Sequence, residues 1–372
     1  MQSEHNSFHE AIIRYAAAHG PWRVVCSTEA TVAAFRFLRQ LDCDGALVRI
    51  ISPAMAREAR RVAFPVVNYS SWLDNPGVPT VRRDDAAMGK ICAEHLLEKG
   101  FRRFGVVGVP GGWFIEARRA SFVATVAAVG LGSGLSCHAI ESCPLTAADH
   151  EKFRHWLASL RPPVGLFLTD DEDAPVLMEV CREVGWKIPQ DVAVVAGFGH
   201  ADTVHACVPA LSAAWEDGAA MGWRAAEYLD RLMSGHTHSV KTVVVPPYGF
   251  EALGSSDTVA VDDAVVARAV AYIRTHAGEK INIADVARQV SVARVTLERR
   301  FRRAMGSSLH AYLTRERVEL AKDYLRTESS LSLNAIANRC GFANRKRLNL
   351  VFRRFLLASP AAWRHEARKK AG

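Results

Sequence analysis

The chain has 372 residues, of which 49% are hydrophobic and 23% are charged, an ordinary balance for a folded protein that argues against disorder. At roughly 150 residues per domain, this length indicates two or more domains. No apolar run reaches the ~18 residues needed to cross a bilayer, and the polar N-terminus lacks the apolar core of a signal peptide, so we expect a cytoplasmic protein without a membrane segment.

The charge is divided unevenly along the chain. Residues 265–372 carry 23 Lys and Arg against 8 Asp and Glu, a net charge of +15, whereas residues 1–264 carry 24 against 31, a net charge of −7. A domain this basic favours nucleic acid as its partner, because binding to phosphates releases condensed counterions. An anionic membrane surface is the competing partner, but the basic helices also carry apolar residues spaced for a core. We therefore expect the last third to bind double-stranded DNA.

The first two-thirds of the chain alternate short apolar strands with helices. Such alternation predicts a doubly wound α/β domain with a parallel sheet. The loops at the carboxyl ends of these strands are where ligands bind in this architecture. The predicted strands are 22–26, 45–50, 66–67, 104–108, 164–169 and 192–196, and the predicted helices are 11–19, 30–41, 86–99, 116–129, 174–184 and 219–233.

A helix-breaking, polar stretch separates two regions of different pattern. It contains Pro246, Pro247 and the run Gly-Ser-Ser-Asp at 254–257. We place a linker at 247–262, which leaves a domain at 1–246 and a second domain at 263–372. After the linker every pattern is helical, so the second domain is expected to be all-α.

The second domain contains an internal repeat. Each copy has a short helix with a small Ala, a tight turn, and a second helix anchored by Leu and Phe four residues apart, which lie on one helix face. This is the pattern of a helix-turn-helix unit. The first copy has Ile283, Val286, Ala287, Leu297 and Phe301; the second has Leu333, Ile336, Ala337, Leu348 and Phe352, at offsets of 50 and 51 residues.

Polar side chains lie on the face of each second helix that is opposite the buried anchors. Arg and Lys suit guanine edges and phosphates, while Asn suits adenine. A long helix follows Gly306, with Ser307 as its expected cap, and would hold both recognition helices about one DNA turn, ~34 Å, apart. The alternative is a helical bundle whose arginines are merely solvated. The candidate DNA contacts are Arg294, Val295, Glu298 and Arg299 in the first copy and Arg345, Lys346 and Asn349 in the second.

Residues 265–372 resemble the AraC/XylS family DNA-binding domain over its whole length. The resemblance implies base-contacting roles for the candidate residues above. The motif residues that carry it are Leu297, Phe301, Gly306, Tyr312, Leu313, Arg317, Ala321, Ile336, Ala337, Cys340, Gly341, Phe342, Phe352, Pro360, Trp363 and Arg364.

The first two-thirds resembles the LacI/GalR-type sensor domain, which is similar to two-lobed periplasmic sugar-binding proteins. The motifs are Asp84, Asp85 and Gly89 with His95, Leu96, Lys99 and Gly100, then Arg118 with Phe122, Thr169 with Asp170, and Pro189 with Asp191 and Val192. This domain order is similar to that of the xylose operon regulatory protein family. The resemblance implies a small ligand, such as a sugar, in the cleft.

Two features depart from the sensor pattern. Phe198 stands where such domains carry a late Asp, and a ring can stack on a sugar but cannot accept hydroxyl protons. Residues 1–9 contain no opening strand, so either the start codon is misplaced or the strand has been lost, and a lost strand would leave a sheet edge for a dimer partner or tail to cover. The candidate effector contacts are Asp84, Trp113, Arg118, Asp170 and Phe198.

We therefore predict a DNA-binding transcription regulator of carbohydrate genes, most simply an activator, that acts as a homodimer and contacts RNA polymerase if it activates. The alternative is a constitutive regulator whose degenerate sensor serves only for dimerisation. A sugar-processing enzyme with a nucleic-acid anchor is a third class, but the chain lacks a Gly-rich phosphate loop, an identifiable carboxylate pair and a nucleophile motif. We expect no enzyme activity, no metal and no cofactor.

Overall fold

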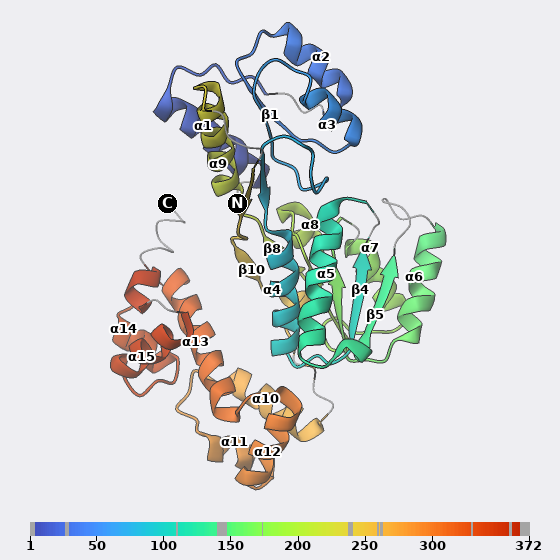
Figure 1. Cartoon of the computed structure of the whole chain (residues 1–372). Coiled ribbons are helices and arrows are strands. Elements are labelled where there is room, and N and C mark those ends of the chain that lie inside the picture. Colours follow the sequence, from blue (N-terminus) through green and yellow to red (C-terminus); the bar gives the residue numbers. More distant parts are fainter. Residues whose placement is uncertain are drawn as a thin grey trace. The chain divides into compact units, whose positions relative to one another are not determined.

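The computed structural model of the chain is drawn in Figure 1. It describes residues 4–26, 30–108, 111–139, 147–172, 174–236, 241–258, 260, 263–328, 330–356 and 359–364. The chain divides into two compact units, residues 1–258 and 259–372.

The first sheet of unit one has four parallel strands in the order β1-β2-β3-β9. Helices α1 and α9 pack against each other over this sheet, and their side chains share one core with Val67 and Val81. The strands are β1 (Ala46–Val48), β2 (Val66–Asn68), β3 (Thr80–Arg83) and β9 (Thr242–Val245), and the helices are α1 (Glu4–His19), α2 (Val32–Gln40), α3 (Pro53–Ala59) and α9 (Gly218–Met233).

The second sheet has the order β10-β8-β7-β6-β4-β5, and its strands are parallel except for β10. The strands are β4 (Phe104–Gly108), β5 (Leu135–Ala139), β6 (Val164–Leu168), β7 (Val192–Ala196), β8 (Ser212–Trp215) and β10 (Gly249–Glu251). The helices are α4 (Asp85–Glu98), α5 (Trp113–Ala128), α6 (Ala147–Ser159), α7 (Ala174–Glu183) and α8 (Ala201–Ala206). The predicted α/β fold is confirmed.

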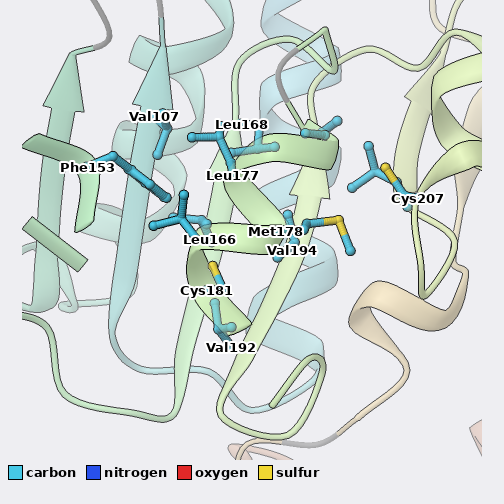
Figure 2. Close-up of a cluster of buried hydrophobic side chains, with 14 of the residues drawn as sticks. Val107, Phe153, Leu166, Leu168, Leu177, Met178, Cys181, Val192, Val194 and Cys207 are labelled. Carbon is cyan, nitrogen blue, oxygen red and sulfur yellow. The ribbon is translucent and has the colours of Figure 1, made fainter. Parts of the chain in front are cut away.

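The second sheet is covered on both faces. Leu166 and Leu168 of β6 belong to a buried cluster with residues of α6 and α7 (Figure 2). The intervening Phe167 stacks on Phe122 of α5, with ring centroids 4.3 Å apart. Burial on both faces explains why these strands read as continuous apolar runs in the sequence.

The strand predicted at 22–26 is absent from the structure, although these residues are described. Strand β1 pairs with β2, and the described residues supply no strand for its other edge. Residues 22–26 do not pair with that free edge and have no regular structure, and Val24 and Val25 are exposed. Within residues 4–26, helix α1 is the first element, and no strand precedes it.

The predicted linker at 247–262 is wrong over its first part. Residues 249–251 form β10, which pairs antiparallel with β8. Ser255 and Ser256 are fully buried, where the Ser255 hydroxyl donates to the carbonyl of Val194 at 2.6 Å and Ser256 contacts Ser212 at 2.7 Å. Serine favours loops because its hydroxyl can replace backbone partners, and here it does so inside a core rather than in solvent.

Unit two is all-helical and contains one core for each repeat. The first core joins α10, α11 and α12 with the start of α13, and the second joins the rest of α13 with α14 and α15. Gly306 ends α12 in the left-handed conformation as expected, but the cap of α13 is Ser308 rather than Ser307. The helices are α10 (Ala264–His276), α11 (Ile283–Gln289), α12 (Arg294–Met305), α13 (Leu309–Thr327), α14 (Leu333–Arg339) and α15 (Arg345–Leu356). Of the described helices, none is long and apolar enough to span a membrane.

Replacing Gly222 with Ala should separate α1 from α9. A Cβ at Gly222 would lie 2.2 Å from the carbonyl oxygen of Phe8, whereas a Cβ at Gly132 meets nothing closer than 3.7 Å. We expect G222A to lower the free energy of unfolding by about 1–3 kcal/mol, as overpacking does, and G132A to leave it nearly unchanged. Calorimetric unfolding of the full chain measures both, and an equal effect of the two substitutions would contradict this packing.

Candidate DNA-binding surface and ligand cleft

The first predicted recognition face lies at the start of α12. Val295 is 76% exposed, and Arg294 and Arg299 are also exposed. Arg294 Nε donates to Glu298 Oε1 at 2.9 Å, so these two side chains are held together on the outer face. Leu297 on the opposite side is fully buried. The first turn of a recognition helix is the part that reaches base edges in helix-turn-helix proteins.

The second predicted recognition face has the same position at the start of α15. Arg345 and Lys346 are exposed and Asn349 is partly exposed. Leu348 and Phe352 are fully buried on the opposite side. Both copies therefore present polar side chains from equivalent turns, while their apolar anchors hold the helix in its own core.

The turn between the two helices of each unit uses a left-handed residue at the same place. Ser291 has φ 56° in the first copy and Gly341 has φ 67° in the second. Glycine is required at 341, because a Cβ there would lie 2.4 Å from the carbonyl oxygen of Glu279 and 2.6 Å from that of Ala277. The second unit thus packs directly on the loop that joins α10 to α11.

Arg317 of α13 binds the same loop. Its Nε donates to the carbonyl of Ala277 at 3.0 Å, and its Nη2 donates to those of Glu279 and Ile281 at 2.9 and 2.8 Å. Hydrogen bonds from a charged donor are stronger than neutral ones. We define residues 277–281 with Arg317 and Gly341 as the joint, because they connect the first helix-turn-helix unit to the second.

Unit one contains a cavity of about 490 Å³, a size typical of small-ligand sites. Aromatic side chains and charged side chains share its wall. The aromatic lining residues include Phe8, Tyr69, Trp72, Phe114 and Phe198, and the charged ones include Arg49, Arg83, Asp170, Glu172 and Glu216.

Arg118 lies beneath this cavity rather than in its wall. It is fully buried, its Nε donates to Asp85 Oδ1 at 2.8 Å, and its Nη1 donates to the carbonyl of Thr169 at 2.7 Å. Helix α4 approaches α5 closely enough for this pair because Gly89 has no side chain, and a Cβ there would lie 2.1 Å from the Arg118 carbonyl oxygen. Arg118 Nη1 also lies 3.5 Å from Oδ2 of Asp170, which lines the cavity, so Arg118 braces the cavity wall through protein groups.

Arg83, unlike Arg118, lines the cavity. Its Nε donates to Asp85 Oδ1 at 3.0 Å and its Nη1 to Glu216 Oε2 at 3.1 Å, and its guanidinium carbon lies 4.5 Å from the centre of the Phe198 ring. Burial by itself would lower the pKa of Arg83, but the carboxylates of Asp85 and Glu216 raise it above its ordinary value. Arg83 therefore stays charged in the cavity wall.

Of the five predicted effector contacts, Asp170 and Phe198 line the cavity. Asp84 caps α4, accepting a hydrogen bond from the Ala87 amide at 2.9 Å. Trp113 lies under the guanidinium of Arg82, 3.8 Å from its carbon to the ring centre. Asp84 and Trp113, like Arg118, are outside the cavity lining.

Asp170, Asp171 and His200 form a cluster whose potential ligand atoms lie within 4.8 Å of one another. Asp171 is fully buried, and its Oδ2 and Oδ1 accept hydrogen bonds from the His200 amide at 2.6 Å and from His200 Nδ1 at 2.8 Å. A metal would have to replace those bonds. The cluster is therefore described by its hydrogen bonds rather than as a metal centre.

Sequence reasoning missed Arg83 and Glu216 as cavity residues. Both stand at the carboxyl end of a strand and directly precede an Asp that caps the next helix. The signal was the repeated order of strand, charged residue, capping Asp and helix. It was hidden because β3 is short and half-charged, so it does not read as a strand.

Two family models match the chain. Residues 93–252 match a periplasmic binding protein-like domain, and residues 286–366 match a helix-turn-helix domain. The first match lies within unit one and the second within unit two.

Curated relatives carry the names of transcription regulators. The xylose operon regulatory protein of Escherichia coli K12 is 28% identical over 329 residues, covering 86% of this chain and 83% of that protein. A putative AraC-like transcription regulator of Streptomyces antibioticus is 30% identical over 178 residues, covering 48% of this chain and 57% of the relative.

Solved structures share the fold. One described as a xylose-binding transcription activator covers 98% of this chain and 95% of its own, with a TM-score of 0.61 and 24% identity. A LacI family transcriptional regulator from Enterococcus faecium, solved with bound ribose, covers 69% of this chain and 96% of its own, with a TM-score of 0.53 and 18% identity.

Replacing Arg118 with Ala should destabilise unit one, because it removes the fully buried one of the two arginines that pair with the Asp85 carboxylate and leaves only Arg83. Loss of one member of a buried ion pair costs about 3–5 kcal/mol. The neighbouring Arg119 pairs with Glu116 on the surface and is the matched control, since exposed pairs contribute at most about 1 kcal/mol. Equilibrium denaturation of the two variants measures the difference. Wild-type stability in R118A would show that the guanidinium is not structural.

Proposed function

We infer that a sugar controls the DNA binding of this chain, which is an AraC-type transcription regulator with an N-terminal periplasmic-binding-protein-like domain. The observation that carries the DNA-binding part is the repeated helix-turn-helix unit with equivalent exposed faces. The net charge of +15 on residues 265–372 supports phosphate binding.

Base reading is proposed for the seven predicted contacts, which start at Arg294 in α12 and Arg345 in α15. The joint supports simultaneous binding of both recognition helices to DNA. Arg317 and Gly341 hold the second helix-turn-helix unit against the loop between α10 and α11, which belongs to the first. Two recognition helices held this way can enter successive segments of the major groove on one side of the DNA.

The effector is proposed to bind in the cavity of unit one. Rings such as Trp72 and Phe198 offer flat faces for a sugar, while Asp170 and Glu216 offer acceptors for its hydroxyls. Two similar proteins described by their ligands, one xylose-binding and one with bound ribose, support a pentose as the first candidate. Phe198 can stack on such a sugar but accepts no hydroxyl proton, so other residues have to supply the acceptors.

The active form is proposed to be a cytoplasmic homodimer that activates transcription through contact with RNA polymerase. The homodimer and the contact with RNA polymerase are proposed from the helix-turn-helix regulators to which the chain is similar. A constitutive regulator with a degenerate sensor is not favoured, because the chain is similar to xylose operon regulatory proteins and to a xylose-binding transcription activator.

Substitution of the recognition faces should change sequence preference. We expect R299A and R345A each to lose about 1–3 kcal/mol of discrimination at the bases that they contact. The matched control is R353A in the last turn of α15, which should weaken all sequences alike. DNA enriched from a random pool by the wild-type chain supplies the site, and competition binding measures the variants. Equal losses on every sequence for R299A and R345A would contradict the assigned faces.

A sugar that binds the cavity should raise the melting temperature of the full chain, because a ligand that binds only the folded state stabilises it. The panel is D-xylose, D-ribose, D-xylulose, D-glucose, cellobiose and D-glucuronate, measured by thermal shift and calorimetry. Asp170→Ala is expected to weaken binding of the active sugar. No stabilisation by any member of the panel would contradict a sugar effector.

A further inference from the structure

The loop that follows β7 lines the cavity and contains few polar side chains. Residues 197–200 are Gly, Phe, Gly and His, so the polar side chain in this run is that of His200. Both Phe198 and His200 line the cavity. Their rings meet edge to face, with centroids 4.7 Å apart and an interplanar angle of 84°.

His200 is held by a carboxylate from the neighbouring strand end. Asp171 follows β6, is fully buried, and uses both oxygens on His200, one on its amide and one on Nδ1. Burial raises the pKa of Asp171, and the hydrogen bonds from His200 oppose that rise. An acceptor at Nδ1 fixes the proton of a neutral imidazole on Nδ1 and fixes the ring orientation.

The side chain of His200 is nevertheless 53% exposed, so this fixed ring meets the space where a ligand would lie. We propose that His200 is a specificity-determining contact for the sugar, that its Nε2 accepts a hydrogen bond from a ligand hydroxyl, and that Asp171 is the positioning residue that aims it. Asp170, whose carboxylate belongs to the same cluster, adds a second acceptor beside it. This inference rests on the proposed sugar effector.

Two substitutions at position 200 separate the proposed ligand contact of Nε2 from the hydrogen bond between Nδ1 and Asp171. In His200→Asn the amide nitrogen takes the place of Nδ1 and keeps the bond to Asp171, but nothing replaces Nε2. In His200→Gln the amide reaches the place of Nε2, but Asp171 loses its side-chain donor. His205 lies on α8 with its side chain exposed and does not line the cavity, so His205→Asn is the matched control.

The probe is the member of the sugar panel that binds the wild-type chain, titrated by calorimetry into each full-length variant. We expect His200→Asn to melt like the wild type and to bind about 3- to 10-fold more weakly, which corresponds to one neutral hydrogen bond. His200→Gln should melt lower and lose less affinity. His205→Asn should match the wild type in both respects.

Wild-type affinity in His200→Asn would overturn the proposal, because that variant removes Nε2 with the outer part of the ring while keeping a donor to Asp171. Should this variant melt well below the wild type, Asp171→Asn provides the second test, since it keeps His200 and its ring but weakens the acceptor at Nδ1. Unchanged affinity in a normally melting Asp171→Asn would overturn the positioning role. If no sugar binds the wild-type chain, the proposed effector itself fails; if a sugar binds the wild type and His200→Asn equally well, the effector stands and only this inference fails.

Discussion

The hydrogen bonds from Arg317 to the loop between α10 and α11 fix the arrangement of the two helix-turn-helix units within the DNA-binding domain. Two helix-turn-helix units with separate cores would otherwise be joined only through α13. By donating to three carbonyls of residues 277–281, Arg317 ties the second half of α13 to the first unit. Gly341 brings the turn of the second unit onto the same loop. A fixed spacing between recognition helices converts two weak contacts with DNA into one specific contact, because the second binds without further loss of freedom.

In unit one, buried ion pairs hold the wall of the cavity in place. Arg118 and Asp85 form a fully buried pair beneath the cavity, and Arg83 joins that pair to Glu216 in the wall. The same unit ends in a buried anchor at Ser255 and Ser256, and only residues 259–262 separate Thr258 from Asp263, the cap of α10.

The sequence allowed the helix-turn-helix repeat to be predicted because each core residue recurs at a fixed offset and amphipathic helices carry a strong local period. The elements that escaped prediction depend on non-local partners. Residues 22–26 have strand composition but pair with no described strand, and β10 exists because β8 lies beside it. The burial of Arg118 against Asp85 likewise depends on how closely α4 and α5 approach at Gly89. Such pairing and burial depend on tertiary contacts, which the local pattern of a single sequence does not reveal.

The central claim is that one cleft controls one pair of recognition helices. Hydroxyl-radical footprinting of the full chain on its selected DNA, with and without the sugar that binds unit one, tests it most directly. We expect two protected segments per chain, centred about one helical turn, ~10.5 base pairs, apart on one face of the DNA, and a sugar-dependent change in the protein concentration that gives half protection. A single protected segment, or protection that the bound sugar does not change, would contradict it.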